Sequence, residues 1–255
     1  MSDIRIEQAG GVLRIDFNRP EKKNAITAAM YRMLAEALES AGSDRAVRAI
    51  LFGSTSPVFT AGNDLGDFRS NPPRSADSPV FRFLRAVSGA EKPMLAAVAG
   101  PAVGIGTTML LHCDFVVAAK GARFHLPFVD LALVPEAASS YLLPRLAGWQ
   151  AAAEMLMLGL PVDAPRALAL GFVHKVVEEA ELEPVALGLA RALAAKPPEA
   201  LRLTRRLMKD GVREGVAAAL EREGRVFAER LLTPEAKEAF DAFFEKRKPD
   251  YSKFG

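Results

Sequence analysis

The alternation of apolar and polar positions at the start of the chain predicts a β-hairpin. Ile4 and Ile6 alternate with charged residues, and a Gly10-Gly11 pair separates them from the run Val12–Phe17. Alternating apolar residues are typical of a strand with one buried face, and a pair of glycines suits the tight turn between two such strands.

Beyond the hairpin, the pattern predicts helices that alternate with further strands. Apolar residues at helical spacing follow Thr27, whose hydroxyl suits an N-cap. Short apolar runs predict strands at Val47–Phe52, Met94–Val98 and Asp114–Ala118. This alternation favours parallel β-α units in an α/β fold, although the order of the strands in the sheet does not follow from it.

From about Ala137 onward the pattern is mostly helical, apart from one predicted strand at Val173–Val177. Three amphipathic helices are predicted in the last quarter: Thr204–Asp210, Val212–Leu232 and Pro234–Lys246. In the last of them, Phe240, Phe243 and Phe244 form an apolar stripe. The stripe either packs on the chain's own core or contacts another subunit.

Composition narrows the class of protein. Half of the 255 residues are hydrophobic, a quarter are charged and the net charge is only +2, so we expect a globular protein without a nucleic acid partner. Cys113 is the single cysteine and lies in an apolar run, which excludes an intrachain disulfide and favours an inert buried thiol. The N-terminus is polar and no apolar stretch is long enough to span a bilayer, so we expect a cytoplasmic protein without a membrane partner.

Two glycine-containing loops are the main candidates for chemistry. One runs from Phe59 to Leu65 and the other from Ala97 to Gly106, and each follows a predicted strand. Glycine lets backbone N–H groups approach a ligand closely, and two such groups that converge on one oxygen form an oxyanion hole. Either loop alone is also explained as a tight turn.

Together with two further segments, these loops resemble the crotonase, or enoyl-CoA hydratase/isomerase, superfamily over nearly the whole chain. The matching segments, in chain order, are Asn18-Arg19-Pro20 with Lys23-Asn24-Ala25, Ala61-Gly62-Asn63-Asp64-Leu65, Gly100–Gly106 and Gly159–Val173. The resemblance implies a crotonase-like α/β spiral of ββα units as a core over 1–195. It also implies a C-terminal α-helical region over 196–255 that joins subunits in a homotrimer or a dimer of trimers.

The resemblance further implies an acyl-CoA thioester as substrate, with coenzyme A entering as part of it and no separate cofactor. The backbone N–H groups of Asn63 and Ile105 would hold the thioester oxygen. The implied substrate-binding residues are Lys23, Ala25, Ala61, Gly62, Asn63, Asp64, Leu65, Gly104, Thr108 and Phe128. The three histidines show no metal-ligand spacing, so no metal site is expected.

The carboxylates distinguish between reactions of this superfamily. Its hydratases use two glutamates, because one group activates water while another manages the proton at C2. Thr108 and Phe128 occupy the matching positions here, which argues against simple hydration. Glu136 lies in a segment, Leu131–Leu146, that resembles the peroxisomal-type Δ3,Δ2-enoyl-CoA isomerases. The resemblance implies that Glu136 takes the C2 proton of a 3-enoyl thioester and returns it at C4.

Other interpretations remain open at this point. Without the resemblance, Glu136 is more simply a first-turn acid of a helix over Ala137–Leu146, where the helix dipole favours acids, and the two roles are compatible. The chain could instead be a hydratase, an isomerase of a ring-derived CoA ester, or a non-catalytic acyl-CoA-binding or RNA-binding member. Four basic residues form a short face that is typical of a solvated helix side: Arg202, Arg205, Arg206 and Lys209.

Overall fold

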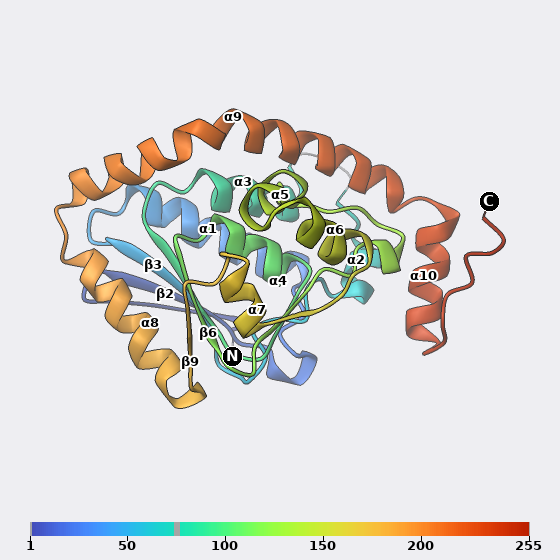
Figure 1. The fold of residues 1–255 in the computed structure, drawn as a ribbon, viewed down its shortest axis with the longest axis horizontal. Helices are drawn as coiled ribbons and strands as arrows, with labels where there is room; N and C mark the ends of the chain where they lie inside the picture. The colour runs from blue at the N-terminus through green and yellow to red at the C-terminus, as the bar shows by residue number, and fades with distance from the viewer. Residues whose placement is uncertain (1, 74–76, 255) are drawn as a thin grey trace.

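The computed structural model describes residues 2–73 and 77–254. A six-stranded sheet forms the centre of the α/β fold, and helices lie on both of its faces (Figure 1). In spatial order its strands are β1 (Ile4–Ala9), β2 (Val12–Phe17), β3 (Ala49–Ser54), β4 (Met94–Val98), β6 (Phe115–Ala119) and β9 (Lys175–Val177). A second sheet consists of β5 (Pro101–Val103), β7 (Arg123–His125) and β8 (Val162–Asp163).

The large sheet confirms both the hairpin and the parallel β-α units. Strands β1 and β2 pair antiparallel, with Ile4 opposite Phe17 and Ala9 opposite Val12. The remaining neighbours, from β2 through β9, pair in parallel. The third strand begins at Ala49 and runs through Ser54, later than predicted, because Val47 is still part of the turn that precedes it.

The apolar runs are continuous because both faces of the sheet are buried. In β3, Ile50 and Phe52 face the main core, whereas Ala49 and Leu51 face helix α8 (Glu179–Ala194) on the opposite side. Strand β4 alternates in the same way. The sheet is therefore a rigid support, and the segments that follow its strands are held in place by it.

The other helical elements connect the strands and cover the main core. The first helix begins as predicted, since the Met30 N–H donates to the Thr27 hydroxyl at 3.3 Å. These elements are η1 (Pro20–Lys22), α1 (Ala28–Ser43), α2 (Leu65–Ser70), α3 (Pro79–Gly89), α4 (Ile105–Thr108), η2 (Met109–His112), η3 (Val129–Leu131), α5 (Ser139–Ala147), α6 (Trp149–Met157) and α7 (Ala164–Ala169).

The C-terminal region consists of α9 (Pro198–Arg230) and α10 (Pro234–Phe244), and α9 arches over α3 and α5 (Figure 1). The predicted break between Asp210 and Val212 is wrong, because α9 is one helix of 33 residues. An exposed glycine costs a helix only about 1 kcal/mol, and tertiary packing outweighs that cost. Gly215 and Gly224 let α9 approach its neighbours closely, since a Cβ at either position would collide with an aromatic ring.

The aromatic stripe on α10 is split between core and surface. Phe240 is buried, whereas Phe243 and Phe244 are 57% and 42% exposed. The stripe therefore does not pack as a unit on the chain's own core.

None of the described helices combines the length and the apolar character needed to cross a membrane.

Candidate active site

The structure brings the two glycine loops side by side. The Thr60 N–H donates to the Pro101 carbonyl at 3.2 Å, and the Val103 N–H donates to the Thr60 carbonyl at 3.0 Å. Gly62 has a φ of +83°, and a Cβ on it would lie 2.8 Å from the Val103 oxygen. Only glycine allows this backbone conformation together with this close approach.

Each loop carries a backbone N–H group without an acceptor. Asn63 follows Gly62 in the first loop, and Ile105 follows Gly104, where φ is +54°, in the second. Among the described residues, neither the Asn63 N–H nor the Ile105 N–H donates a hydrogen bond. An oxyanion hole needs two donors that converge on one oxygen, and each of these adjoining loops supplies one unpaired donor.

The segment Lys23–Ala25 holds the first glycine loop in place through hydrogen bonds. The buried Asn24 amide donates to the carbonyls of Val58 at 2.8 Å and Phe59 at 3.2 Å. The Ala61 N–H donates to the Lys23 carbonyl at 2.9 Å. Lys23 and Asn24 both adopt left-handed backbone conformations, which these hydrogen bonds hold in place. The Lys23 side chain is exposed.

Asp64 holds the other end of this loop. Its carboxylate accepts hydrogen bonds from the N–H groups of Gly66 and Asp67 at the start of α2, each at 3.1 Å. It also pairs with Arg19 at 2.7 Å. Burial by itself would raise the pKa of Asp64, but the Arg19 guanidinium and the two N–H groups outweigh it and lower the pKa. Asp64 is thus an ionised anchor for the loop.

Glu136 lies near the same loops, since its charge acts on Tyr31, which is bonded to Asn63. It is buried, and the Thr108 hydroxyl donates a hydrogen bond to its carboxylate. Thr108 lies three residues after Ile105 in α4, so the carboxylate is anchored about one helical turn, roughly 5 Å of rise, from the free Ile105 N–H. Burial raises the pKa of Glu136 to about 8, the Thr108 hydrogen bond opposes this rise and the negative charge of Glu223 adds to it.

Glu136 is not a first-turn acid, and that interpretation of its role is wrong. Helix α5 begins at Ser139, because Ala137 and Ala138 both adopt left-handed conformations with φ of 58°. The first N–H groups of α5 are bonded by a different acid. Glu223, which projects from α9, accepts from the Ala138 N–H at 2.6 Å.

Sequence reasoning missed three side chains at this site. The buried Tyr31 donates its hydroxyl to the side-chain oxygen of Asn63 at 2.5 Å. Burial, together with the nearby charge of Glu136, raises the pKa of Tyr31 well above its usual value. The ring of His112 is hydrogen-bonded to the Ala137 carbonyl at 2.8 Å, and burial lowers the pKa of His112 to about 4. The third is Glu223.

Helical spacing in the sequence gives a weak indication of two of these side chains, Tyr31 and Glu223. Tyr31 lies beside Met30 on the face of the first predicted helix that turns toward the core. Glu223 lies between Ala219 and Phe227, each four residues away and buried. An acid in a buried row suggests a specific partner, but the sequence does not say which.

The remaining predicted site residues surround these loops or the core beneath them. Gly62, Thr108 and Phe128 are buried, and Ala25, Ala61, Asn63, Asp64, Leu65 and Gly104 are partly exposed. Around the Glu136 segment, Phe128 and Leu133 belong to one buried core cluster with Ala137, and the partly buried Leu131 and Val134 pack against it. In the described part of the chain, no group of His, Cys, Asp and Glu side chains is placed to hold a metal ion.

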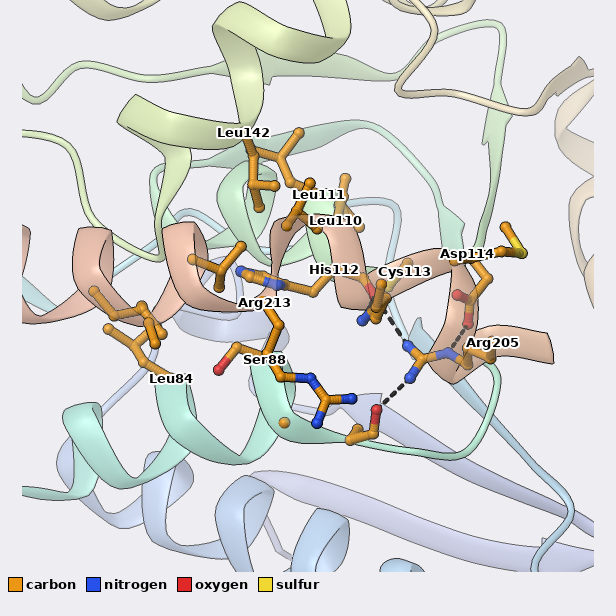
Figure 2. Close-up of a pocket in the computed structure, with 18 of the residues that line it drawn as sticks. Leu84, Ser88, Leu110, Leu111, His112, Cys113, Asp114, Leu142, Arg205 and Arg213 are labelled. Atoms are coloured by element: carbon orange, nitrogen blue, oxygen red, sulfur yellow. Dashed lines mark hydrogen bonds and ion pairs between the residues drawn. The ribbon is translucent and has the colours of Figure 1, made fainter. Parts of the chain in front are cut away.

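A cavity of about 1570 Å³ lies along α9, and its lining includes His112 but not Glu136. Figure 2 shows Arg205 on one side of this cavity, turned toward Asp114, with which it pairs at 2.7 Å. Arg205 is buried, and Lys209 donates to the His112 carbonyl at 3.3 Å. The predicted solvated basic face is therefore wrong for these two residues, because α9 packs this side against the segment that precedes β6.

Comparisons with known proteins agree with the fold. Residues 7–253 match the family described as enoyl-CoA hydratase/isomerase. A crystal structure of enoyl-CoA hydratase/isomerase from Pseudoalteromonas atlantica T6c superposes with a TM-score of 0.94 at 43% identity, over 98% of this chain and 100% of that chain.

Two curated relatives carry different activity names. The rat protein named enoyl-CoA delta isomerase 2 is 36% identical over 250 residues, 96% of this chain and 64% of that protein. The Arabidopsis thaliana protein named probable enoyl-CoA hydratase 2, mitochondrial, is 33% identical over 249 residues, 95% of this chain and 82% of that protein. The chain thus spans less than two thirds of the rat relative, and such identities do not separate isomerase from hydratase.

Proposed function

This chain belongs to the enoyl-CoA hydratase/isomerase family, within the crotonase superfamily, and we propose that it converts a 3-enoyl-CoA thioester into the conjugated 2-enoyl-CoA. The observation that carries the proposal is one buried carboxylate, Glu136, bonded to the helical turn whose first N–H, that of Ile105, is free. Members of this family process acyl-CoA thioesters, so the proposal concerns which reaction this chain performs.

In the proposed mechanism, the N–H groups of Asn63 and Ile105 bind the thioester oxygen and Glu136 removes a proton from C2. The electron pair of the broken C2–H bond moves toward the oxygen and leaves a dienolate. Protonated Glu136 then forms the new C4–H bond, the double bond settles between C2 and C3, and the carbonyl is restored. Each oxyanion donor contributes about 3–4 kcal/mol in comparable sites.

The number of available carboxylates supports isomerisation over hydration. Hydration needs a second acid or base near the substrate, but Thr108 uses its hydroxyl to bond Glu136 and Phe128 is apolar. Glu223 is the other acid near Glu136, and its oxygens are occupied by donors at the start of α5. One carboxylate that carries a proton between two carbons of the same substrate suffices for a double-bond shift.

The raised pKa of Glu136 suits this role. A base with a pKa of about 8 binds the C2 proton more strongly than an ordinary carboxylate, and its conjugate acid is still able to deliver the proton to C4. Activity is expected to increase with pH as Glu136 loses its proton in the free enzyme.

The remaining parts of the proposal concern substrate and assembly. We propose that Lys23, Ala25 and the segment from Ala61 to Leu65 lie along the coenzyme A moiety, which needs no separate cofactor. The exposed Lys23 is suited to meet a phosphate. We also propose a cytoplasmic homotrimer or dimer of trimers, with the core over 1–195 and the subunit-joining helices over 196–255.

The test compares substrates on the purified protein. A 3-hexenoyl-CoA, a 2-hexenoyl-CoA and a ring-derived, non-conjugated CoA ester are supplied separately, and the conjugated thioester absorbance is followed. We expect the absorbance to rise with the 3-enoyl substrate and to stay constant with the 2-enoyl substrate. Efficient loss of absorbance from 2-hexenoyl-CoA would identify a hydratase, and turnover of the ring-derived ester alone would identify the other isomerase class.

A further inference from the structure

We propose that Glu223 is a positioning residue, whose buried carboxylate reaches from α9 and holds the backbone that presents Glu136 to the substrate. This inference rests on the proposed function only for the reaction that Glu136 performs. The contacts that carry it lie outside the oxyanion hole, and Glu223 itself lies outside the segments that carry the family resemblance.

The segment after Glu136 is strained and needs external support. Ala137 and Ala138 are consecutive residues in the left-handed region, each with φ of 58°. A side chain with a Cβ is disfavoured there, and such conformations persist only where the surroundings impose them. Alanine side chains form no hydrogen bonds, so the support must come from groups that bind their backbone.

Glu223 supplies this support on one side. Its two oxygens accept from the Ala138 N–H at 2.6 Å, the Ser140 N–H at 2.9 Å and the Ser140 hydroxyl at 2.5 Å. The residue is only 7% exposed. A carboxylate that receives three donors inside the protein fixes the direction in which the chain enters α5.

Two further contacts complete the frame on the other side. The His112 ring is bonded to the Ala137 carbonyl at 2.8 Å, and the Ser139 hydroxyl donates to the Glu136 carbonyl at 2.6 Å. Every residue from Glu136 to Ser140 thus has at least one polar backbone or side-chain group bound. Among these contacts, Glu223 alone introduces a negative charge.

That charge distinguishes Glu223 from a purely structural support. The titratable group that acts on Glu136 is Glu223 from α9, and Arg222 in turn lowers the pKa of Glu223. Tyr31, from α1, lies within the electrostatic reach of Glu136, whose charge raises the pKa of the Tyr31 hydroxyl. His112, from η2, faces the same segment and stays neutral near neutral pH because burial lowers its pKa to about 4. The negative Glu223 therefore helps Glu136 to hold its proton, in addition to fixing its position.

The test uses Glu223→Gln and Glu223→Asp, with Glu221→Gln as the matched control on the exposed side of the same helix. In Glu223→Gln an amide donor replaces one acceptor and the charge is lost. We expect kcat for 3-enoyl-CoA to fall about tenfold or more. We also expect the acid limb of the kcat/KM profile to move to lower pH by about half a unit or more. Glu221→Gln should match the wild type both in kcat and in the pH of the acid limb.

Glu223→Asp keeps the charge and shortens its reach. Its kcat should fall while the acid limb stays where it is in the wild type, which separates position from charge. If Glu223→Gln does not fold, a wild-type kcat in Glu223→Asp overturns the proposal. If it does fold, a kcat within about twofold of wild type together with an unmoved acid limb overturns it.

A second readout does not depend on turnover. The side-chain carboxyl carbon of Glu136, labelled with carbon-13 and assigned through Glu136→Gln, is titrated by NMR in the wild type and in Glu223→Gln. We expect the Glu136 midpoint to fall in the variant. If the wild type does not isomerise 3-enoyl-CoA, the proposed function fails, while an unchanged midpoint would contradict the influence of Glu223 on Glu136.

Discussion

Burial, a hydroxyl group and a second carboxylate act together on Glu136. Burial raises its pKa most, Thr108 lowers it through a hydrogen bond, and Glu223 raises it through repulsion. The outcome is a pKa of about 8, near the pH at which a base that must also act as an acid works best.

The first prediction concerns Thr108. Thr108→Val removes the hydroxyl at nearly constant volume, so the ionised form of Glu136 loses a hydrogen bond and its pKa should rise further. The acid limb of kcat/KM should move to higher pH, and kcat at neutral pH should fall by about tenfold. Thr108→Ser keeps a hydroxyl and serves as the control. If the acid limb of kcat/KM lies at the same pH in Thr108→Val as in the wild type, the hydrogen bond from Thr108 does not influence the pKa of Glu136.

The second concerns stability. The folded-state pKa of Glu136 lies at about 8, above the ordinary 4.5, so the folded protein keeps a proton that the unfolded chain releases between these values. The free energy of unfolding should therefore fall as pH rises through this window. Glu136→Gln does not titrate, so its Tm relative to wild type should increase from pH 5 to pH 8, by about 2 °C or more. An equal Tm difference at both pH values would contradict the raised pKa.

The residues of this site differ in how far the sequence indicates them. Glu136, Asn63 and Ile105 lie in recognisable motifs, because their positions depend on local loop conformation. Glu223 reaches Ala138 across 85 positions of the chain, and no local pattern encodes a contact of that separation. The hydrogen bond between Tyr31 and Asn63 could not be predicted from the sequence for the same reason.

At the scale of elements, the site depends on how closely the two loops pack. Gly62→Ala places a Cβ 2.8 Å from the Val103 oxygen at a φ of +83°, so the loops must separate. We expect a loss of about 1–3 kcal/mol in stability. We also expect a fall of about tenfold or more in kcat/KM as the Asn63 N–H moves.

The control for this change is Gly188→Ala. Gly188 is an exposed residue of α8 with open space around its Cβ position, so alanine should stabilise the protein by about 0.5–1 kcal/mol and leave activity unchanged. Urea unfolding and thioester turnover measure both effects. Wild-type turnover in Gly62→Ala would argue against the proposed oxyanion hole.

Elements in which a regular apolar pattern extends over several residues could be predicted from the sequence, and shorter elements could not. The hairpin, α1 and the central strands follow from their patterns. Strands β5 and β8 contain only three and two residues and exist because β7 pairs with both, which no periodicity reveals. The continuity of α9 past Gly211 was missed because packing against α3 and α5, rather than helix propensity, decides it.

At the scale of the whole molecule, several large apolar side chains are exposed. Those on the helices include Leu146, Trp149, Met157, Leu168, Leu207, Met208, Phe243 and Phe244. Trp149 and Met208 are 71% and 75% exposed. Such a surface is consistent with the proposed assembly of subunits.

The proposed oligomer has a defined mass. Light scattering after size exclusion should give about three or six times the 27.4 kDa of one chain. The mass should persist upon dilution to concentrations used for activity measurements. A mass of one chain under these conditions would contradict the proposed trimer.

The central claim is that Glu136 alone moves the proton, and one comparison tests it most directly. Wild type and Glu136→Gln are mixed with 3-hexenoyl-CoA, and formation of the conjugated thioester is followed while binding of the product is measured in parallel. We expect kcat to fall by about a thousandfold or more in Glu136→Gln, with product affinity within about threefold of wild type. Retention of isomerisation by Glu136→Gln would contradict the account, and another acid would then have to be the base.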